Sequence, residues 1–134
     1  MNTKPTLVLS DLHAIAAAAE AEALKNGWAV AIAIVDDGGH LLWLQRLDGA
    51  APISSEIAPA KARTAAMGRR ESKVYEDMIN QGRVSFLSAT LQCMLEGGVP
   101  IMADGVCVGA VGVSGVKSSE DAQIARAGIA ALGL

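Results

Sequence analysis

An Asp-Gly dipeptide between two apolar runs is the feature that most constrains how this chain folds. Asp104-Gly105 separates residues 99–102 from residues 106–111, and β-branched residues stand on both sides. Asp and Gly both tolerate the positive φ that the two central residues of a tight hairpin turn require. The sequence therefore predicts a β-hairpin, and a hairpin imposes antiparallel pairing.

A second hairpin is predicted earlier in the chain. Residues 28–35 read WAVAIAIV, so large side chains fall on one side of a strand and alanines on the other. Asp36-Asp37-Gly38-Gly39 follows as a turn, and residues 40–47 return as the partner strand. Both faces of residues 28–35 are apolar, so both are expected to be covered, and the alanine face would let a helix approach closely.

Two helices are predicted around this hairpin. Ser10 fits the N-cap of a helix over residues 11–25, whose apolar residues repeat at helical spacing and which ends at Asn26-Gly27. Ser54-Ser55 would cap a second helix that runs to about Met67, with Pro59 placed in its first turn, where a missing N–H costs least.

The second half of the chain adds further helices. Residues 72–80 are predicted as a short helix, while residues 83–95 stay open between a loop, a helix and a strand. Ser118 and Asp121 fit a capping box at the start of a last helix, which runs to Leu132.

This order of elements predicts an α+β fold in which helices pack on one antiparallel sheet. A length of 134 residues fits one domain over residues 1–134. Hydrophobic residues make up 51% of the chain and aromatic residues only 3%, so small aliphatic side chains must fill the core. Because such side chains bury little area each, further burial at a subunit interface is a plausible supplement.

Charge and hydropathy exclude some classes of partner. The net charge of −3, with no basic cluster longer than Arg69-Arg70, argues against nucleic acid. No apolar run reaches the roughly 20 residues of a membrane span, and residues 1–6 do not resemble an export signal. Cys93 and Cys107 fit a reduced compartment, so the expected location is cytoplasmic.

Four polar residues are the candidates for chemistry. His40 directly follows a Gly-Gly turn and could serve as an axial metal ligand or an acid/base group. Arg46, Asp48 and Lys61 are charges in apolar surroundings. Lys61 could bind a carboxylate or lose its proton when buried. In the alternative interpretation Arg46 pairs with Asp48 and Lys61 only extends to solvent, while Arg63 faces outward.

The remaining motifs give weaker indications of a functional site. His13 lies within the first predicted helix, where a packed or surface histidine is the usual case. The glycine-rich run that leads into Ser118 could bind an anion or could simply reverse the chain. The histidines and carboxylates show no zinc-ligand spacing, and no dinucleotide fingerprint opens a helix.

Several short motifs, taken in order, resemble one known family. They are VDDGGHLL (35–42), RLDGA (46–50), AKARTA (60–65), GGVPI (97–101) and VGAVGVSG (108–115), followed by Asp121 and Ala127-Gly128. In this order and spacing they are similar to the GlcG/HbpS-like haem-degrading domain family, which includes the C-terminal domains of PduO-type proteins. The similarity extends from about Leu7 to Leu132.

The resemblance implies an α/β sandwich with a central antiparallel sheet of about five strands in a profilin-like arrangement. It also implies a homo-oligomer, such as a hexamer or octamer, and haem or a related tetrapyrrole as ligand, with slow haem degradation in some members. No single haem motif is shared by the family. His40 as iron ligand and Arg46 and Lys61 as partners of the propionates are therefore hypotheses from side-chain chemistry.

Two other functions stay open at this point. The chain could be a small-acid catabolic enzyme of the isomerase or lyase type. Lys61 and His40 would then act catalytically and, with Arg46, hold a carboxylate at a subunit interface. It could also be an accessory oligomer without catalysis.

Overall fold

The computed structural model describes residues 1–134 and shows one four-stranded antiparallel sheet between helices. Along the chain the elements are α1 (Leu9–Lys25), β1 (Ala31–Asp36), β2 (Leu41–Arg46), α2 (Ser54–Gly68), α3 (Lys73–Asn80), the 3₁₀ helix η1 (Val84–Ser88), β3 (Gly98–Ala103), β4 (Val106–Ser114) and α4 (Ser118–Ala130). The strand order in the sheet is β2-β1-β4-β3. The predicted α+β fold class is confirmed, with four strands where the resemblance implied about five.

Both predicted hairpins are present. β3 and β4 join at Asp104 and Gly105, whose φ angles of 52° and 76° are the positive values that the turn prediction required. β1 and β2 form the other hairpin, with a bulge between Ile34 and Val35. β1 also pairs with β4 in antiparallel register, which joins the two hairpins into one sheet.

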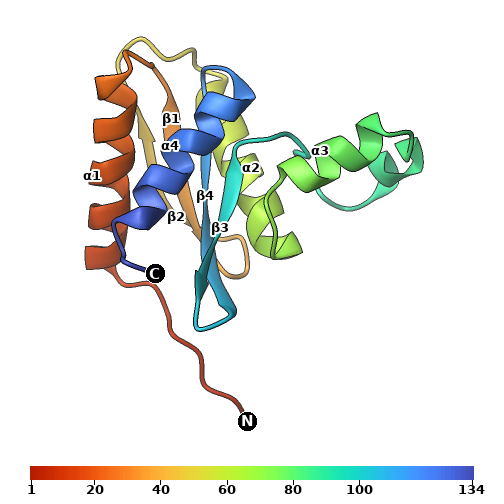
Figure 1. The fold of residues 1–134 in the computed structure, drawn as a ribbon, viewed down its shortest axis with the longest axis horizontal. Coiled ribbons are helices and arrows are strands. Elements are labelled where there is room, and N and C mark those ends of the chain that lie inside the picture. The colour runs from red at the N-terminus through yellow and green to blue at the C-terminus, as the bar shows by residue number, and fades with distance from the viewer.

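The helices cover the two faces of the sheet unequally (Figure 1). α1 and α4 lie together over one face, and α2 lies over the other. The face under α1 and α4 carries the larger side chains of the strands and forms the main core. That core includes Ile32, Ile34, Ile101, Val111 and Val113 from the sheet and Ile15 and Ile124 from the helices.

The other face is lined by small residues, as the alanine pattern predicted. Ala31 and Ala33 of β1 pack against Ala58 of α2. At Gly112 a Cβ atom would lie 2.1 Å from the carbonyl oxygen of Ala58 and 2.5 Å from the backbone N of Ala62. Only glycine allows this contact, so the backbone of α2 rests directly on β4.

Three predicted helix starts need correction. Pro59 is the sixth residue of α2, beyond its first turn, so the carbonyl of Ser55 receives no helical N–H from that position. α1 begins at Leu9, and its cap is made by Asp11, whose carboxylate accepts the N–H of Val8 at 2.9 Å.

The predicted capping box at the last helix is also wrong by one residue. α4 is capped at Lys117, whose N–H is accepted by Glu120 at 3.2 Å. Asp121 is thereby free to act in the interior, where it meets Lys61.

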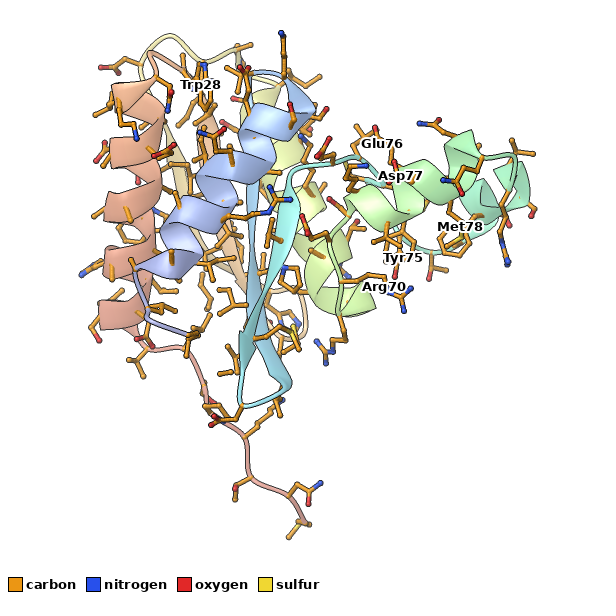
Figure 2. All side chains as sticks on the ribbon, in the orientation of Figure 1. Trp28, Arg70, Tyr75, Glu76, Asp77 and Met78 are labelled. Atoms are coloured by element: carbon orange, nitrogen blue, oxygen red, sulfur yellow. The ribbon has the colours of Figure 1, made fainter.

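The segment between α2 and β3 forms an arm that projects from the sheet (Figure 1). The arm consists of α3 and η1, so the open segment 83–95 contains a short 3₁₀ helix. Tyr75 stacks on Phe86 with ring centroids 5.2 Å apart, and Figure 2 shows Tyr75 on the same side of α3 as Arg70. The chain exposes 6975 Å², slightly more than the about 6,600 Å² expected for a compact 13.7 kDa monomer.

Candidate functional site

His40 and Asp36 form a hydrogen-bonded pair at the turn between β1 and β2. The Nδ1 atom of His40 lies 3.1 Å from both carboxylate oxygens of Asp36. The same carboxylate accepts the backbone N–H groups of Gly38 and His40 at 2.9 Å each. Asp36 therefore shapes the turn and orients the imidazole ring at once.

The charge state of Asp36 follows from these contacts. Partial burial pushes the pKa of this carboxyl up, but the hydrogen bonds from His40 and Gly38 outweigh that effect, so the pKa lies below its usual value. An ionised carboxylate can only accept, which places a proton on Nδ1. The Nε2 atom of a neutral His40 is left with its lone pair available to a ligand.

His40 lines a groove of about 390 Å³ between the β1–β2 turn and α2. The lining residues are Val35, Gly39, His40, Leu41, Glu56, Pro59, Ala60, Arg63 and Gln92. Arg63 brings a cation to the wall opposite the turn. A Cβ atom at Gly39, whose φ is +83°, would lie 2.9 Å from Cγ of Arg63, so the glycine turn and the arginine stem pack closely.

Lys61 lies outside this groove, in the interior of the protein. Its side chain is only 4% exposed, and its ammonium lies 3.1 Å from Oδ2 of Asp121 and 3.1 Å from the carbonyl oxygen of Val113. Asp121 is equally buried and also accepts the N–H of Val116 at 3.2 Å. This pair ties α2, on one face of the sheet, to α4, on the other.

Burial dominates the electrostatics of this pair. Desolvation raises the pKa of Asp121 above its usual value, and the opposing charge and hydrogen bond of Lys61 only partly offset that rise. The pair therefore acts as an internal brace, by which we mean a buried ion pair that links α2 to α4. Removal of either partner would leave the other as an uncompensated polar group in the core.

Arg46 and Asp48 are exposed and form no ion pair with each other. Arg46 ends the edge strand β2, and its Cα partner is Ala31 of β1. Of the four sequence-predicted candidates, only His40 lines the groove; Arg46, Asp48 and Lys61 do not.

The sequence-based expectation missed one groove residue, Arg63, and the role of Asp36, which orients His40 without lining the groove itself. Asp36 was assigned only to a turn, although its spacing of four residues from His40 allows the contact. Arg63 was expected to face outward; it is exposed, as expected, and in addition lines the groove. The signal available in the sequence was the position of Arg63 on the side of α2 away from its alanines. The sequence of the helix alone does not predict that the glycine turn packs against this side.

The remaining candidates are structural. His13 is exposed and packs edge-on against Trp43, with ring centroids 5.4 Å apart. Cys93 and Cys107 are both free. No group of three or more His, Cys, Asp or Glu side chains is arranged to hold a metal ion. None of the helices is both long and apolar enough to cross a membrane.

The fold and groove define a class: a small α+β protein whose histidine, oriented by a carboxylate, lines an open groove beside a four-stranded sheet. A family model described as haem degrading protein HbpS-like matches residues 7–130. The chain belongs to this HbpS-like haem-degrading family.

Known relatives agree with this assignment. Protein GlcG of Escherichia coli strain K12 is 56% identical over 114 residues, which is 85% of each chain. A crystal structure of HbpS is similar with a TM-score of 0.89 and 34% identity, covering 100% of this chain and 95% of that one. A crystal structure of a PduOC–haem complex gives a TM-score of 0.85 and 31% identity, covering 95% of both chains.

Proposed function

We propose that this protein binds haem or a related tetrapyrrole in the groove beside the β1–β2 turn, with His40 as the iron ligand. The observation that carries the proposal is the orientation of His40, whose Nδ1 is held by Asp36 while its ring lines the groove. Metal-ligating histidines commonly donate their second ring N–H to a carboxylate in this way. Membership of the HbpS-like family and the similarity to a PduOC–haem complex support the choice of ligand.

The side chains around the groove offer the apolar and cationic contacts that a tetrapyrrole with propionate groups requires. Leu41 and Pro59 supply apolar contacts, and Arg63 supplies a cation for a propionate. The groove volume of about 390 Å³ is at the low end for a ligand site. A large tetrapyrrole would therefore extend beyond the groove.

Bound haem would supply an iron centre with its redox chemistry, on which slow degradation of the ring depends. The chain itself binds and orients the ligand. Asp36 keeps the proton on Nδ1 of His40, and Arg63 balances negative charge at the groove wall. Lys61 was hypothesised to contact a propionate. Because its ammonium is already bonded inside the core, we assign it the supporting role of holding α2 in place.

The proposal includes self-association as a homo-oligomer, a hexamer or an octamer, in the cytoplasm. Exposed apolar side chains on β2 support self-association, because a monomer would leave them in water. Two free cysteines are compatible with a reducing compartment.

Haemin titration followed by absorbance tests the ligand. The wild-type protein should shift the Soret band and saturate at a fixed stoichiometry. His40→Ala should abolish or strongly weaken this shift, and Asp36→Asn should weaken it less, because the ring remains but loses its orientation. His13→Ala is the matched control, since it removes the chain's other histidine away from the groove, and it should titrate like the wild type.

Two results would contradict the proposal. A featureless titration without saturation would exclude specific haem binding by the wild type. Equal Soret shifts in His40→Ala and the wild type would exclude His40 as the ligand.

The groove also favours a second candidate, the small-acid enzyme. A histidine oriented by a carboxylate is the arrangement of a general acid/base, and Arg63 lies in the same groove as a cation for a substrate carboxylate. The volume of the groove suits a small hydroxy or keto acid. Turnover of such an acid that is lost in both His40→Ala and Arg63→Ala, in a protein that fails to bind haemin, would favour this candidate over the first.

A further inference from the structure

The outer edge of β2 carries backbone groups without partners in the chain. Hydrogen bonds alternate along a strand, and Leu47, just beyond β2, directs its N–H to the carbonyl of Val30. Gln45 and Trp43 therefore point their backbone groups toward β1, while Leu44 and Arg46 point theirs outward. β2 is the terminal strand of the sheet, on the side away from the arm (Figure 1).

The same strand carries an uncovered apolar face. Leu41, Leu42 and Leu44 are 52%, 40% and 43% exposed. Leu44 lies opposite Ala33, so its side chain is on the α2 face of the sheet. α1 covers the other face of β2, where Gln45 donates to Glu20 at 3.0 Å and Trp43 packs on His13.

Apart from the charged Arg46 at its end, β2 lacks the devices that normally protect an edge. Its sequence, LLWLQR, contains no proline and no lysine, and its bulge lies at the turn end, leaving residues 43–46 in regular register. Exposed edges of this kind are templates for pairing with another strand.

We propose that the edge of β2 is an interface with a second copy of this chain, in which two β2 strands pair antiparallel about a two-fold axis. This inference rests on the self-association proposed above and names its surface. The strand is complementary to itself. A two-fold axis at Gln45 pairs the outward N–H and C=O groups of Leu44 with those of Arg46 in the other copy, and places the two Leu44 side chains diagonally across the joined strands on one face.

The size of the patch argues for a copy of the chain over a short peptide. A six-residue strand is about 20 Å long, whereas a stable interface buries about 800 Å² per partner. The strand edge alone is too narrow for this. A second copy adds its own leucine face and α2, while an isolated peptide would add only a backbone. Hexamers and octamers with dihedral symmetry contain such two-fold contacts.

Measurement of mass in solution by light scattering tests the interface. The wild type should have a mass that is an even multiple of the chain. Leu44→Pro removes the outward N–H of the edge but no hydrogen bond to β1, and it should lower the mass at least twofold. Leu42→Lys combined with Leu44→Lys should do the same by placing like charges face to face.

Met102→Lys is the matched control, because Met102 is 41% exposed on the opposite edge strand β3. It should keep the wild-type mass. Circular dichroism confirms that each variant is folded. A monomeric wild type would overturn both the interface and the proposed self-association. An oligomeric wild type whose mass is unchanged in both folded β2 variants would overturn the interface alone.

Discussion

The two edge strands of the sheet, β3 and β2, differ in whether their outward backbone groups have hydrogen-bond partners. At β3, both backbone groups of Gly98 are bonded to Ser72: its N–H donates to the Ser72 hydroxyl at 2.9 Å, and its carbonyl accepts the Ser72 N–H at 3.0 Å. Pro100 then removes the next outward N–H, and a bulge follows at Ile101. At β2 no proline interrupts the edge, and the bulge lies at the turn end of the strand, away from Leu44 and Arg46.

This difference shows that the chain covers the β3 edge with its own residues and leaves the β2 edge as a surface for another molecule. The closed edge is also closely packed. Gly98 packs against the carbonyl of Lys61, where a Cβ atom would lie 2.2 Å away, and Lys61 is braced by Asp121. The open edge carries leucines in water and adjoins the groove of His40. Substitutions at β3 should therefore change folding stability, and substitutions at β2 should change association.

The largest effect on stability is expected for Lys61→Met. It leaves the carboxyl of Asp121 buried without its cation, and removal of one partner of a buried pair typically costs about 3–5 kcal/mol. Denaturant unfolding measures the loss. Asp121→Leu should cost a similar amount, and the double variant should recover much of it. Strictly additive losses in the double variant would show that the two residues do not stabilise each other.

Gly98→Ala should be the next most damaging change. Its Cβ atom would meet the backbone of α2 at the carbonyl of Lys61, so β3 or α2 must shift, at about 1–3 kcal/mol. Leu42→Lys on the open edge is the counterpart and should change monomer stability by no more than about 0.5 kcal/mol. The comparison of the two edges fails if these two variants lose equal stability at a protein concentration below that at which the chain associates.

Ser72→Ala tests the hydroxyl that closes the β3 edge. It leaves the buried N–H of Gly98 without an acceptor, which should cost about 1–3 kcal/mol. Thermal unfolding measures the change. Ser88→Ala removes an exposed hydroxyl that bonds only to the carbonyl of Ser85, so it serves as the control and should have little effect. A Ser72→Ala protein as stable as the control would mean that this hydroxyl does not protect the edge.

The smallest effect is expected at the turn beside the open edge. Because the pKa of Asp36 is lowered in the folded state, its contribution to stability is present above the ordinary pKa of 3.8 and is lost as the pH falls through the folded-state value. The Asp36→Asn variant should therefore lose less folding stability than the wild type as the pH falls through the acid range. Asp48→Asn, which breaks no ion pair, is the control. An unchanged acid limb in Asp36→Asn would contradict the assigned role of its carboxylate.

Local sequence signals were sufficient for much of the fold. Asp104-Gly105 predicted its hairpin because the turn chemistry depends on those two residues alone. The alanine face of β1 predicted the close helix because side-chain size sets the spacing of the layers. Helix starts were less certain: Ser10 and Ser118 are good caps, yet the chain begins these helices a residue or two before the predicted starts because Asp11 and Glu120 supply the capping carboxylates.

The candidate site was predictable only in part, because its contacts join distant segments. Lys61 and Asp121 are separated by 60 residues, and no local pattern distinguishes a brace from a binding residue. His40 was identified because it follows a turn. Arg63 was missed because its place in the groove depends on how the β1–β2 turn packs against α2.

Residue-resolved amide hydrogen exchange tests most directly the claim that the chain closes one edge of its sheet and leaves the other for a second copy. In the assembled wild type, the amides of Gly98, Leu44 and Arg46 should all be protected. In the folded double variant Leu42→Lys/Leu44→Lys, Gly98 should stay protected while the amides at positions 44 and 46 exchange rapidly. Rapid exchange at Leu44 and Arg46 in the assembled wild type would contradict the account.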